Sequence, residues 1–317
     1  MGPLAHFFER KIKMSNRTDW FYEAKFGLFV HWTTHSLPKE GEKKSHADAI
    51  KDFQLDTFVS QIVESGAKFV FFTITHADMN VPFALPELDE IMPGLTSERD
   101  LITELADKLE PYGIRLMFYF NGEGSTTPGY METTRFWEDE KYHAEICYKL
   151  TEAISKKYGK KIHGWWIDCC YEPPICKGRG VRYDYKRYAD ALRAGNPDSI
   201  VAFNFMGVEP WGSEWGRNIS DFQAGEENDL SFLPDGRFSG EGGTQWFGLC
   251  WMDDFWVHEK PGTPAPVHSN EKVLDYINKV KAGGGVFAYN VAPYQEGIIS
   301  ENTMEQLRWL KAHGATE

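Results

Sequence analysis

Short apolar runs recur along the chain and, in its first part, alternate with helix-length segments that have one apolar face. This pattern is typical of parallel β-strands joined by amphipathic helices. The runs predict strands over residues 26–32, 67–75, 114–120, 164–170, 200–205, 219–224, 245–251 and 285–290. Apolar residues spaced i, i+3, i+4 predict helices over residues 55–65, 97–112, 138–158, 184–194, 270–282 and 300–313.

This order of strands and helices favours an α/β fold, a (β/α)8 TIM-like barrel built as a single domain. The barrel is expected to cover residues 20–317, after an N-terminal extension over residues 1–19. A doubly wound sheet is the alternative. The chain has no G-x-G-x-x-G or Walker motif, which are the nucleotide-binding motifs that such sheets often carry.

The 317-residue chain has 47 acidic and 34 basic side chains, which gives a formal net charge of −13. It has no stripe of Lys and Arg to follow a phosphate backbone, so we expect no nucleic-acid partner. No apolar run approaches the ~18 residues of a membrane span, so we expect no membrane partner. Charged residues near the N-terminus predict a cytoplasmic protein, unless a signal was removed from a secreted or periplasmic precursor.

The active site of a barrel lies where its strands end, so polar residues that close the apolar runs are candidates for chemistry. Aromatic faces bury the apolar side of a sugar, while imidazole, amide and carboxylate groups bind its hydroxyls. A carboxylate pair also suits cleavage of a glycosidic bond. The closing residues are His31 with Trp32, His76 with Asp78, Asn121 with Glu123, Asp168, Asn204, Glu226 with Glu227, Asp253 with Asp254, and Asn290.

The two carboxylates of interest differ in what the residues around them indicate. Asp168 follows the apolar run 164–167, where an unpaired carboxylate is costly unless a partner or a function requires it. Glu226 stands in the acidic run 226–229, and such a run is usually part of a solvated loop. The residue pattern therefore supports a functional role for Asp168 more strongly than for Glu226.

Several segments form one long pattern of motifs. They include W-F-Y-E-A-K-F-G-L-F-V-H-W at 20–32, T-I-T-H-A-D at 73–78, G-W-W-I-D at 164–168, D-F-Q-A-G-E at 221–226 and K-A-G-G-G-V-F-A-Y-N-V-A-P at 281–293. The pattern resembles the α-L-fucosidases of glycoside hydrolase family 29, from about residue 20 to residue 313. This resemblance implies that His31 binds the sugar, that Asp168 is the nucleophile and that Glu226 is the general acid/base.

Three features depart from the pattern of that family. Ala77 stands where the family has the second of two paired histidines. An arginine expected after the fifth strand has no clear equivalent, because Met206 or Pro210 occupies its place and Arg217 lies farther along. The chain also ends after the barrel, so we expect no C-terminal β-sandwich.

Together these observations predict a retaining exo-glycosidase that hydrolyses terminal α-L-fucosides, or a closely related sugar, by double displacement. Asp168 and Glu226 are the predicted catalytic residues, with Glu227, Glu241 and Asp254 as alternatives for the acid/base. Neighbouring carboxylates such as Glu227, or an apolar wall, are expected to raise the pKa of Glu226. The predicted sugar-binding residues are His31, Trp32, His76, Asp78, Tyr119, Asn121, Asn204 and Trp251.

Two other functions stay open at this level. The same mechanism can act on a different sugar, such as an α-L-galactoside or a modified 6-deoxy sugar, or the chain can be a catalytically silent carbohydrate-binding relative. A metal site built from His31, His76 and Asp78 lacks spacing of the H-E-x-x-H kind, so we expect no metal and no other cofactor. The expected partner is a carbohydrate, and the sequence does not predict the oligomeric state.

Overall fold

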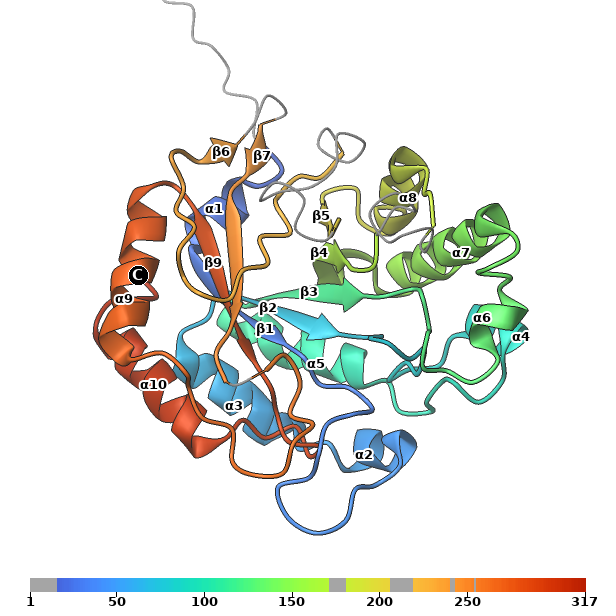
Figure 1. Cartoon of the computed structure of the whole chain (residues 1–317), viewed down its shortest axis with the longest axis horizontal. Helices are drawn as coiled ribbons and strands as arrows, with labels where there is room; N and C mark the ends of the chain where they lie inside the picture. Colours follow the sequence, from blue (N-terminus) through green and yellow to red (C-terminus); the bar gives the residue numbers. More distant parts are fainter. Residues whose placement is uncertain (1–15, 171–180, 206–218, 240–242, 254) are drawn as a thin grey trace, which may run out of the picture.

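The structure, a computed structural model, describes residues 16–170, 181–205, 219–239, 243–253 and 255–317. Within these residues, parallel strands form one curled sheet in the order β5-β4-β3-β2-β1-β9-β8 (Figure 1). The strands are β1 (Phe26–Val30), β2 (Phe69–Thr73), β3 (Arg115–Phe120), β4 (Ile162–Ile167), β5 (Ile200–Phe203), β8 (Phe247–Trp251) and β9 (Val286–Val291). A separate antiparallel pair joins β6 (Phe238–Ser239) to β7 (Thr244–Gln245).

Helices surround the sheet, with α9 and α10 on one side and α7 and α8 on the other (Figure 1). The described α-helices are α1 (Asp19–Ala24), α2 (His46–Asp52), α3 (Leu55–Ser65), α4 (Pro86–Ile91), α5 (Leu101–Leu109), α6 (Tyr130–Thr133), α7 (Glu140–Tyr158), α8 (Tyr185–Leu192), α9 (Asn270–Ala282) and α10 (Glu301–Ala312). Two 3-10 turns, η1 (Glu110–Tyr112) and η2 (Gly159–Lys161), precede β3 and β4. None of the described helices is both long enough and apolar enough to cross a membrane.

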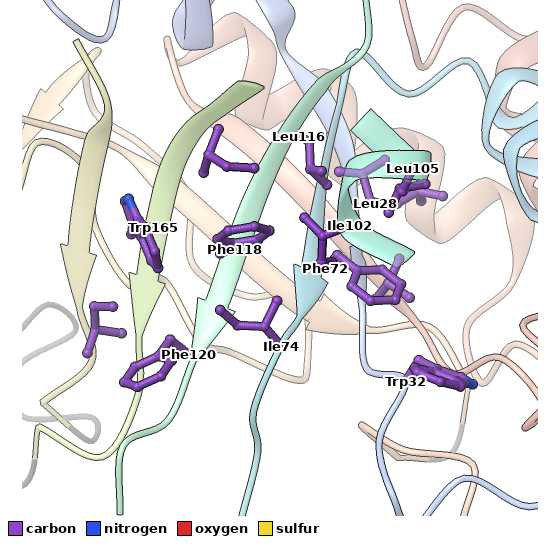
Figure 2. Packing of buried hydrophobic residues seen from close by; sticks show 14 of the residues in the cluster. Leu28, Trp32, Phe72, Ile74, Ile102, Leu105, Leu116, Phe118, Phe120 and Trp165 are labelled. Carbon is purple, nitrogen blue, oxygen red and sulfur yellow. The ribbon is translucent and has the colours of Figure 1, made fainter. Parts of the chain in front are cut away.

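Neighbouring residues of each strand enter two different apolar clusters, because successive side chains of a strand point to opposite faces. The outer cluster packs strand residues such as Leu116 against helix residues such as Leu105, as Figure 2 shows. The inner cluster contains Phe29, Tyr119 and Trp166 from three strands, and one helix α1 residue also enters it. The inner cluster therefore forms the floor below the ends of the strands.

The predicted helices agree closely with the structure. Helices α3 and α9 have the predicted bounds, and α10 and α8 differ from prediction by one or two residues at each end. Helix α5 begins at Leu101 instead of residue 97, because the Asp100 side chain accepts a hydrogen bond from the Thr103 amide and caps the first turn.

The prediction of a regular strand over residues 219–224 is wrong. This segment makes one isolated parallel bridge, between Phe222 and Gln245, in which the Gln223 amide donates to the Gln245 carbonyl. On its other side, the Asp221 amide donates to the Val201 carbonyl. The Val201 amide donates to the Asp221 carboxylate at 2.8 Å, and not to a backbone carbonyl of the segment. The segment thus lies between β5 and β8 without forming a continuous ladder, and the whole arrangement is consistent with a (β/α)8 barrel.

Candidate active site

Hydrogen bonds connect polar side chains at the carboxyl ends of neighbouring strands. The Tyr119 hydroxyl, at the end of β3, donates to Asp168 Oδ2 at 2.6 Å. Asn204, just after β5, donates through Nδ2 to Asp168 Oδ1 at 3.0 Å and to Glu226 Oε2 at 2.9 Å. One amide nitrogen therefore joins the two predicted catalytic carboxylates.

A glycine sets the position of Glu226. Gly225 has a φ of +65°, and a Cβ at this position would lie 1.9 Å from the Phe247 carbonyl oxygen. The backbone approaches β8 so closely that a side chain is excluded, and the left-handed conformation also favours glycine. Beyond it, the Glu227 amide donates to the Leu249 carbonyl at 2.8 Å, which holds the segment against β8.

Glu226 and Glu227 have different surroundings. Glu226 keeps part of its surface exposed, whereas Glu227 is buried and its Oε2 accepts the Ser231 amide at 3.1 Å and the Phe232 amide at 3.4 Å. Adjacent residues of an extended segment point in opposite directions. The structure thus brings Glu226 to Asp168 and uses Glu227 to hold the following loop.

The electrostatic environment distinguishes Glu226 from an ordinary carboxyl group. Desolvation by the surrounding protein, followed by repulsion from the Asp168 carboxylate, raises the pKa of Glu226 to about 7. The hydrogen bond from Asn204 acts in the opposite direction, because it stabilises the charged form. The neighbouring charge is that of Asp168, not that of Glu227 as the sequence suggested.

His31 lies at the end of β1 and is almost fully buried. Its Nδ1 is 2.6 Å from Asn290 Oδ1, and its ring lies edge-on to Tyr119 and His76, with centroids 4.9 and 5.4 Å away. Burial and the nearby His76 lower the pKa of His31 to about 3, against the effect of Asn290. Burial also lowers the pKa of His76. Both rings are therefore neutral near pH 7.

Aromatic side chains extend the site on two sides. On one side, Tyr119 stacks on Trp166 at 5.3 Å and on His76 at 5.7 Å between centroids. On the other, Trp256 lies 5.5 Å from His31 and 5.7 Å from Trp251. The sequence predicted Trp251 but not Trp256. Trp256 lies in the loop after β8, where no regular spacing of apolar residues identifies it. Its position soon after the end of a strand was the only signal in the sequence.

Trp32 does not join this group. It belongs to the outer cluster (Figure 2). Its ring packs edge-on to Phe53, and its indole N–H donates to the Gln295 carbonyl at 3.0 Å. Because Trp32 directly follows His31, the two side chains point to opposite sides of the extended chain. The structure thus gives Trp32 a packing environment, unlike the sugar-contacting one expected from the sequence.

Asp78 and Asn121 support the loops around the site. Asp78 Oδ2 accepts the Thr34 hydroxyl at 2.7 Å, and its Oδ1 accepts the Asn80 amide at 2.9 Å. Asn121 Nδ2 donates to Cys169 Sγ at 3.2 Å, and its Oδ1 accepts the Glu123 amide at 2.8 Å. Both side chains are buried, and these hydrogen bonds connect them to neighbouring loops.

Some predicted positions lie outside the described residues. These are Glu241 and Asp254, the other candidates for the acid/base, and Met206, Pro210 and Arg217, which bear on the expected arginine. In the part of the chain that the structure describes, no group of three or more His, Cys, Asp or Glu side chains is arranged to hold a metal ion.

Comparisons with known proteins identify the family of the chain. The family described as alpha-L-fucosidase matches residues 44–315 of the chain. The tissue alpha-L-fucosidases of Bos taurus and Homo sapiens are each 22% identical to it, over 93% of this chain and 67% or 68% of theirs. This confirms the family resemblance predicted from the motifs.

Solved structures share the fold. Alpha-L-fucosidase isoenzyme 1 from Paenibacillus thiaminolyticus has a TM-score of 0.70 at 18% identity, covering 94% of this chain and 75% of that one. An endo-fucoidan hydrolase of glycoside hydrolase family 107 has a TM-score of 0.72 at 14% identity, covering 94% of this chain and 53% of that one. With the family match over most of its length, the chain belongs to the alpha-L-fucosidase family of glycoside hydrolases.

Proposed function

We propose that this chain is a retaining exo-α-L-fucosidase with Asp168 as nucleophile and Glu226 as general acid/base. The observation that carries the proposal is the Asn204 amide shared by the two carboxylates. Since both oxygens lie within 3.0 Å of one nitrogen, they are at most about 6 Å apart. Retaining glycosidases have a separation of about 5–5.5 Å, whereas inverting enzymes need about 6.5–9.5 Å to admit a water.

In the first step, Glu226 donates its proton to the glycosidic oxygen while an Asp168 oxygen attacks the anomeric carbon. The bond from that carbon to the leaving oxygen breaks, and a covalent glycosyl-enzyme forms with inverted configuration. A pKa of about 7 supports the role of Glu226, because a substantial fraction of the group carries its proton at neutral pH. Tyr119 and Asn204 orient the Asp168 carboxylate before the attack.

In the second step, the Glu226 carboxylate removes a proton from water, and the water oxygen attacks the anomeric carbon. The bond to Asp168 breaks, and the second inversion restores the original configuration of the sugar. Desolvation remains in the covalent intermediate, but loss of the Asp168 charge removes the repulsion that is the second cause of the raised pKa, so the pKa of Glu226 falls. Glu226 can therefore serve as an acid in one step and as a base in the next.

The remaining groups suit recognition of a sugar. His31 and His76 are neutral imidazoles that can bond hydroxyl groups, and Trp251 and Trp256 provide apolar faces. Asp78 and Asn121 act by holding the loops around the site in place. The segment over residues 219–227, between β5 and β8, takes the position of the remaining strand of a (β/α)8 barrel.

A substrate panel tests the proposal. We expect wild type to release the aryl group from an aryl α-L-fucoside, and Asp168→Asn to lose this activity by several powers of ten, on the order of 10⁴. An exposed aspartate supplies the control, since Asp190→Asn should keep full activity. Addition of azide to Asp168→Ala should restore turnover and give a β-L-fucosyl azide, because azide attacks from the side that the carboxylate vacates.

Other panel members distinguish the alternatives. Ala77 removes one imidazole that the family pattern provides, so an aryl α-L-galactoside and a modified 6-deoxy glycoside are included. Cleavage of one of these in preference to the fucoside would keep the mechanism and change the sugar. Depolymerisation of fucoidan without release from the aryl fucoside would contradict the exo assignment. Binding of a fucose-like iminosugar without any turnover would indicate a carbohydrate-binding protein.

A further inference from the structure

We propose that Asn290 is a positioning residue that holds His31 in the tautomer with the proton on Nδ1, leaving Nε2 as a hydrogen-bond acceptor for a sugar hydroxyl. The proposal rests on the proposed function only in assigning the sugar as the partner of Nε2. The tautomer itself follows from the hydrogen bonds of Asn290, and it can be measured without substrate.

The chain of hydrogen bonds has only one consistent direction. Asn290 Nδ2 lies 2.9 Å from the Trp256 carbonyl oxygen, which can only accept, so the amide nitrogen of Asn290 must face it. The amide oxygen then faces His31, and this oxygen also can only accept. Because His31 Nδ1 lies 2.6 Å from that oxygen, it must donate and carry the proton. A neutral ring has one proton, so Nε2 has none.

Burial makes this arrangement rigid. Asn290 is completely inaccessible to solvent and belongs to β9, which pairs with β1 in register at Phe29 and Asn290. His31 stacks on Phe29 with centroids 5.1 Å apart. The imidazole is therefore held from below by Phe29 and from one edge by Asn290, and its Nε2 edge faces away from Asn290.

The surroundings keep the His31 ring neutral. His76, after β2, and Tyr119, on β3, are the titratable side chains whose rings lie next to His31 among the described residues. Charges at Asp168, Asp78, Glu259 and His35 act on His76. Burial and His76 lower the pKa of His31 to about 3, so the ring stays neutral across the working range of most glycosidases. The position of its single proton then decides whether Nε2 accepts or donates.

The same amide connects the ring to the loop after β8. Its nitrogen holds the Trp256 carbonyl, while the Trp256 ring lies 5.5 Å from the His31 ring. One buried asparagine therefore fixes two neighbouring parts of the sugar site, the imidazole acceptor and the backbone that carries an aromatic wall. A substitution that keeps the acceptor for His31 but removes the donor to the Trp256 carbonyl affects both parts, and the dependence on pH isolates the effect at His31.

Asn290→Asp provides this test. A carboxylate still accepts from Nδ1 but stabilises the imidazolium, so it should raise the pKa of His31 and place a second proton on Nε2 in mildly acidic solution. We expect kcat/KM for an aryl α-L-fucoside to fall about three- to tenfold relative to wild type as the pH decreases from 8 to 5, mainly through KM. The matched control is Asn196→Asp. Asn196 is also a buried asparagine, and its Nδ2 donates to a carbonyl, that of Ile162, at the other end of the sheet.

Nitrogen NMR of the histidine rings decides the tautomer directly. Wild type should show His31 with a protonated Nδ1 and a bare Nε2 between pH 5 and 8, even if Asn290→Asp fails to fold. A protonated Nε2 in wild type would overturn the proposal, as would an Asn290→Asp enzyme whose pH profile matches those of wild type and Asn196→Asp. Absence of fucoside turnover by wild type would count against the proposed function alone, because the NMR result does not depend on it.

Discussion

The Tyr119 hydroxyl donates a hydrogen bond of 2.6 Å to Asp168, so one oxygen of the proposed nucleophile has a fixed partner before substrate binds. Hydrogen bonds to charged groups contribute about 1.5–3 kcal/mol, which corresponds to roughly a ten- to hundredfold change in rate. We therefore expect Tyr119→Phe to lower kcat on an aryl α-L-fucoside by this factor. Steady-state kinetics of the purified variant measure the effect.

The control for this variant is another buried tyrosine. In the described part of the chain the Tyr130 hydroxyl has no hydrogen-bond partner, so Tyr130→Phe should keep kcat within about twofold. If Tyr119→Phe turned over substrate as fast as Tyr130→Phe, then Tyr119 would have no role in orienting Asp168.

The raised pKa of Glu226 predicts the alkaline limb of the pH profile. The group must be protonated to act as an acid, and its pKa in the folded enzyme is about 7. We expect kcat/KM to decrease as the pH rises through about 7, because the proton is lost there. Glu226→Gln should abolish this limb and lower the activity by about 10²–10⁴ on substrates with poor leaving groups.

Leaving groups give the contrasting measurement for Glu226. An aryl fucoside with a very acidic phenol needs little protonation, so Glu226→Gln should affect it least in the first step. Equal loss on good and poor leaving groups would argue against Glu226 as the acid. In that case Glu241 or Asp254 would become the residue to substitute next.

Asp253 provides a prediction about stability that does not depend on catalysis. Burial raises its pKa to about 6, although its Oδ1 accepts the Thr303 hydroxyl at 2.6 Å. The folded state thus binds a proton more tightly than the unfolded state, and the free energy of unfolding must decrease as the pH rises from about 4 through 6. Asp253→Asn removes the charge while keeping the shape.

We expect Asp253→Asn to be more stable than wild type at pH 8, by about 1–3 kcal/mol, with the difference disappearing near pH 4. Urea unfolding at both pH values measures it. Asp190→Asn, at an exposed ion pair, is the control and should change the free energy of unfolding by less than about 1 kcal/mol. A destabilised Asp253→Asn at pH 8 would mean that the carboxylate forms stronger bonds than the Thr303 contact.

Trp32 and Trp256 are expected to have different roles, one in packing and one in sugar binding. Trp32 is buried in the outer cluster, so Trp32→Leu should lower the free energy of unfolding by about 2–4 kcal/mol and leave KM within about twofold. Trp256 lies beside His31, so Trp256→Leu should raise KM about tenfold through loss of an aromatic face, at a smaller cost in stability. Denaturant unfolding and steady-state kinetics on both variants test the contrast, and reversed effects would contradict the assignment of the two side chains.

Local patterns were sufficient for most of the fold. Helices α3 and α9 have the bounds expected from their apolar spacing, since the residues that end them, Gly66 and Gly283, directly follow them in the sequence. The segment over residues 219–224 was not predictable in the same way. Its backbone is interrupted by an Asp221 side chain that bonds to another strand and by Gly225, and these contacts depend on residues far away in the sequence.

In the site, too, some residues were predictable from the local sequence and others were not. The rule that chemistry lies at strand ends selected Asp168, Asn204 and Glu226, and hydrogen bonds join these three side chains. Alternation along the extended chain, applied strictly, would have excluded Trp32, because its neighbour His31 faces the site. Trp256 lies in a loop whose course depends on the Asn290 amide, so no local pattern identified it.

The stereochemistry of hydrolysis tests the central claim most directly. Proton NMR, recorded within the first minutes of reaction with an aryl α-L-fucoside, identifies the anomer that leaves the enzyme before mutarotation. Our account predicts α-L-fucose as the first product, because two displacements at Asp168 restore the original configuration. Initial release of β-L-fucose would show a single displacement and contradict the assignment of Asp168 as the nucleophile.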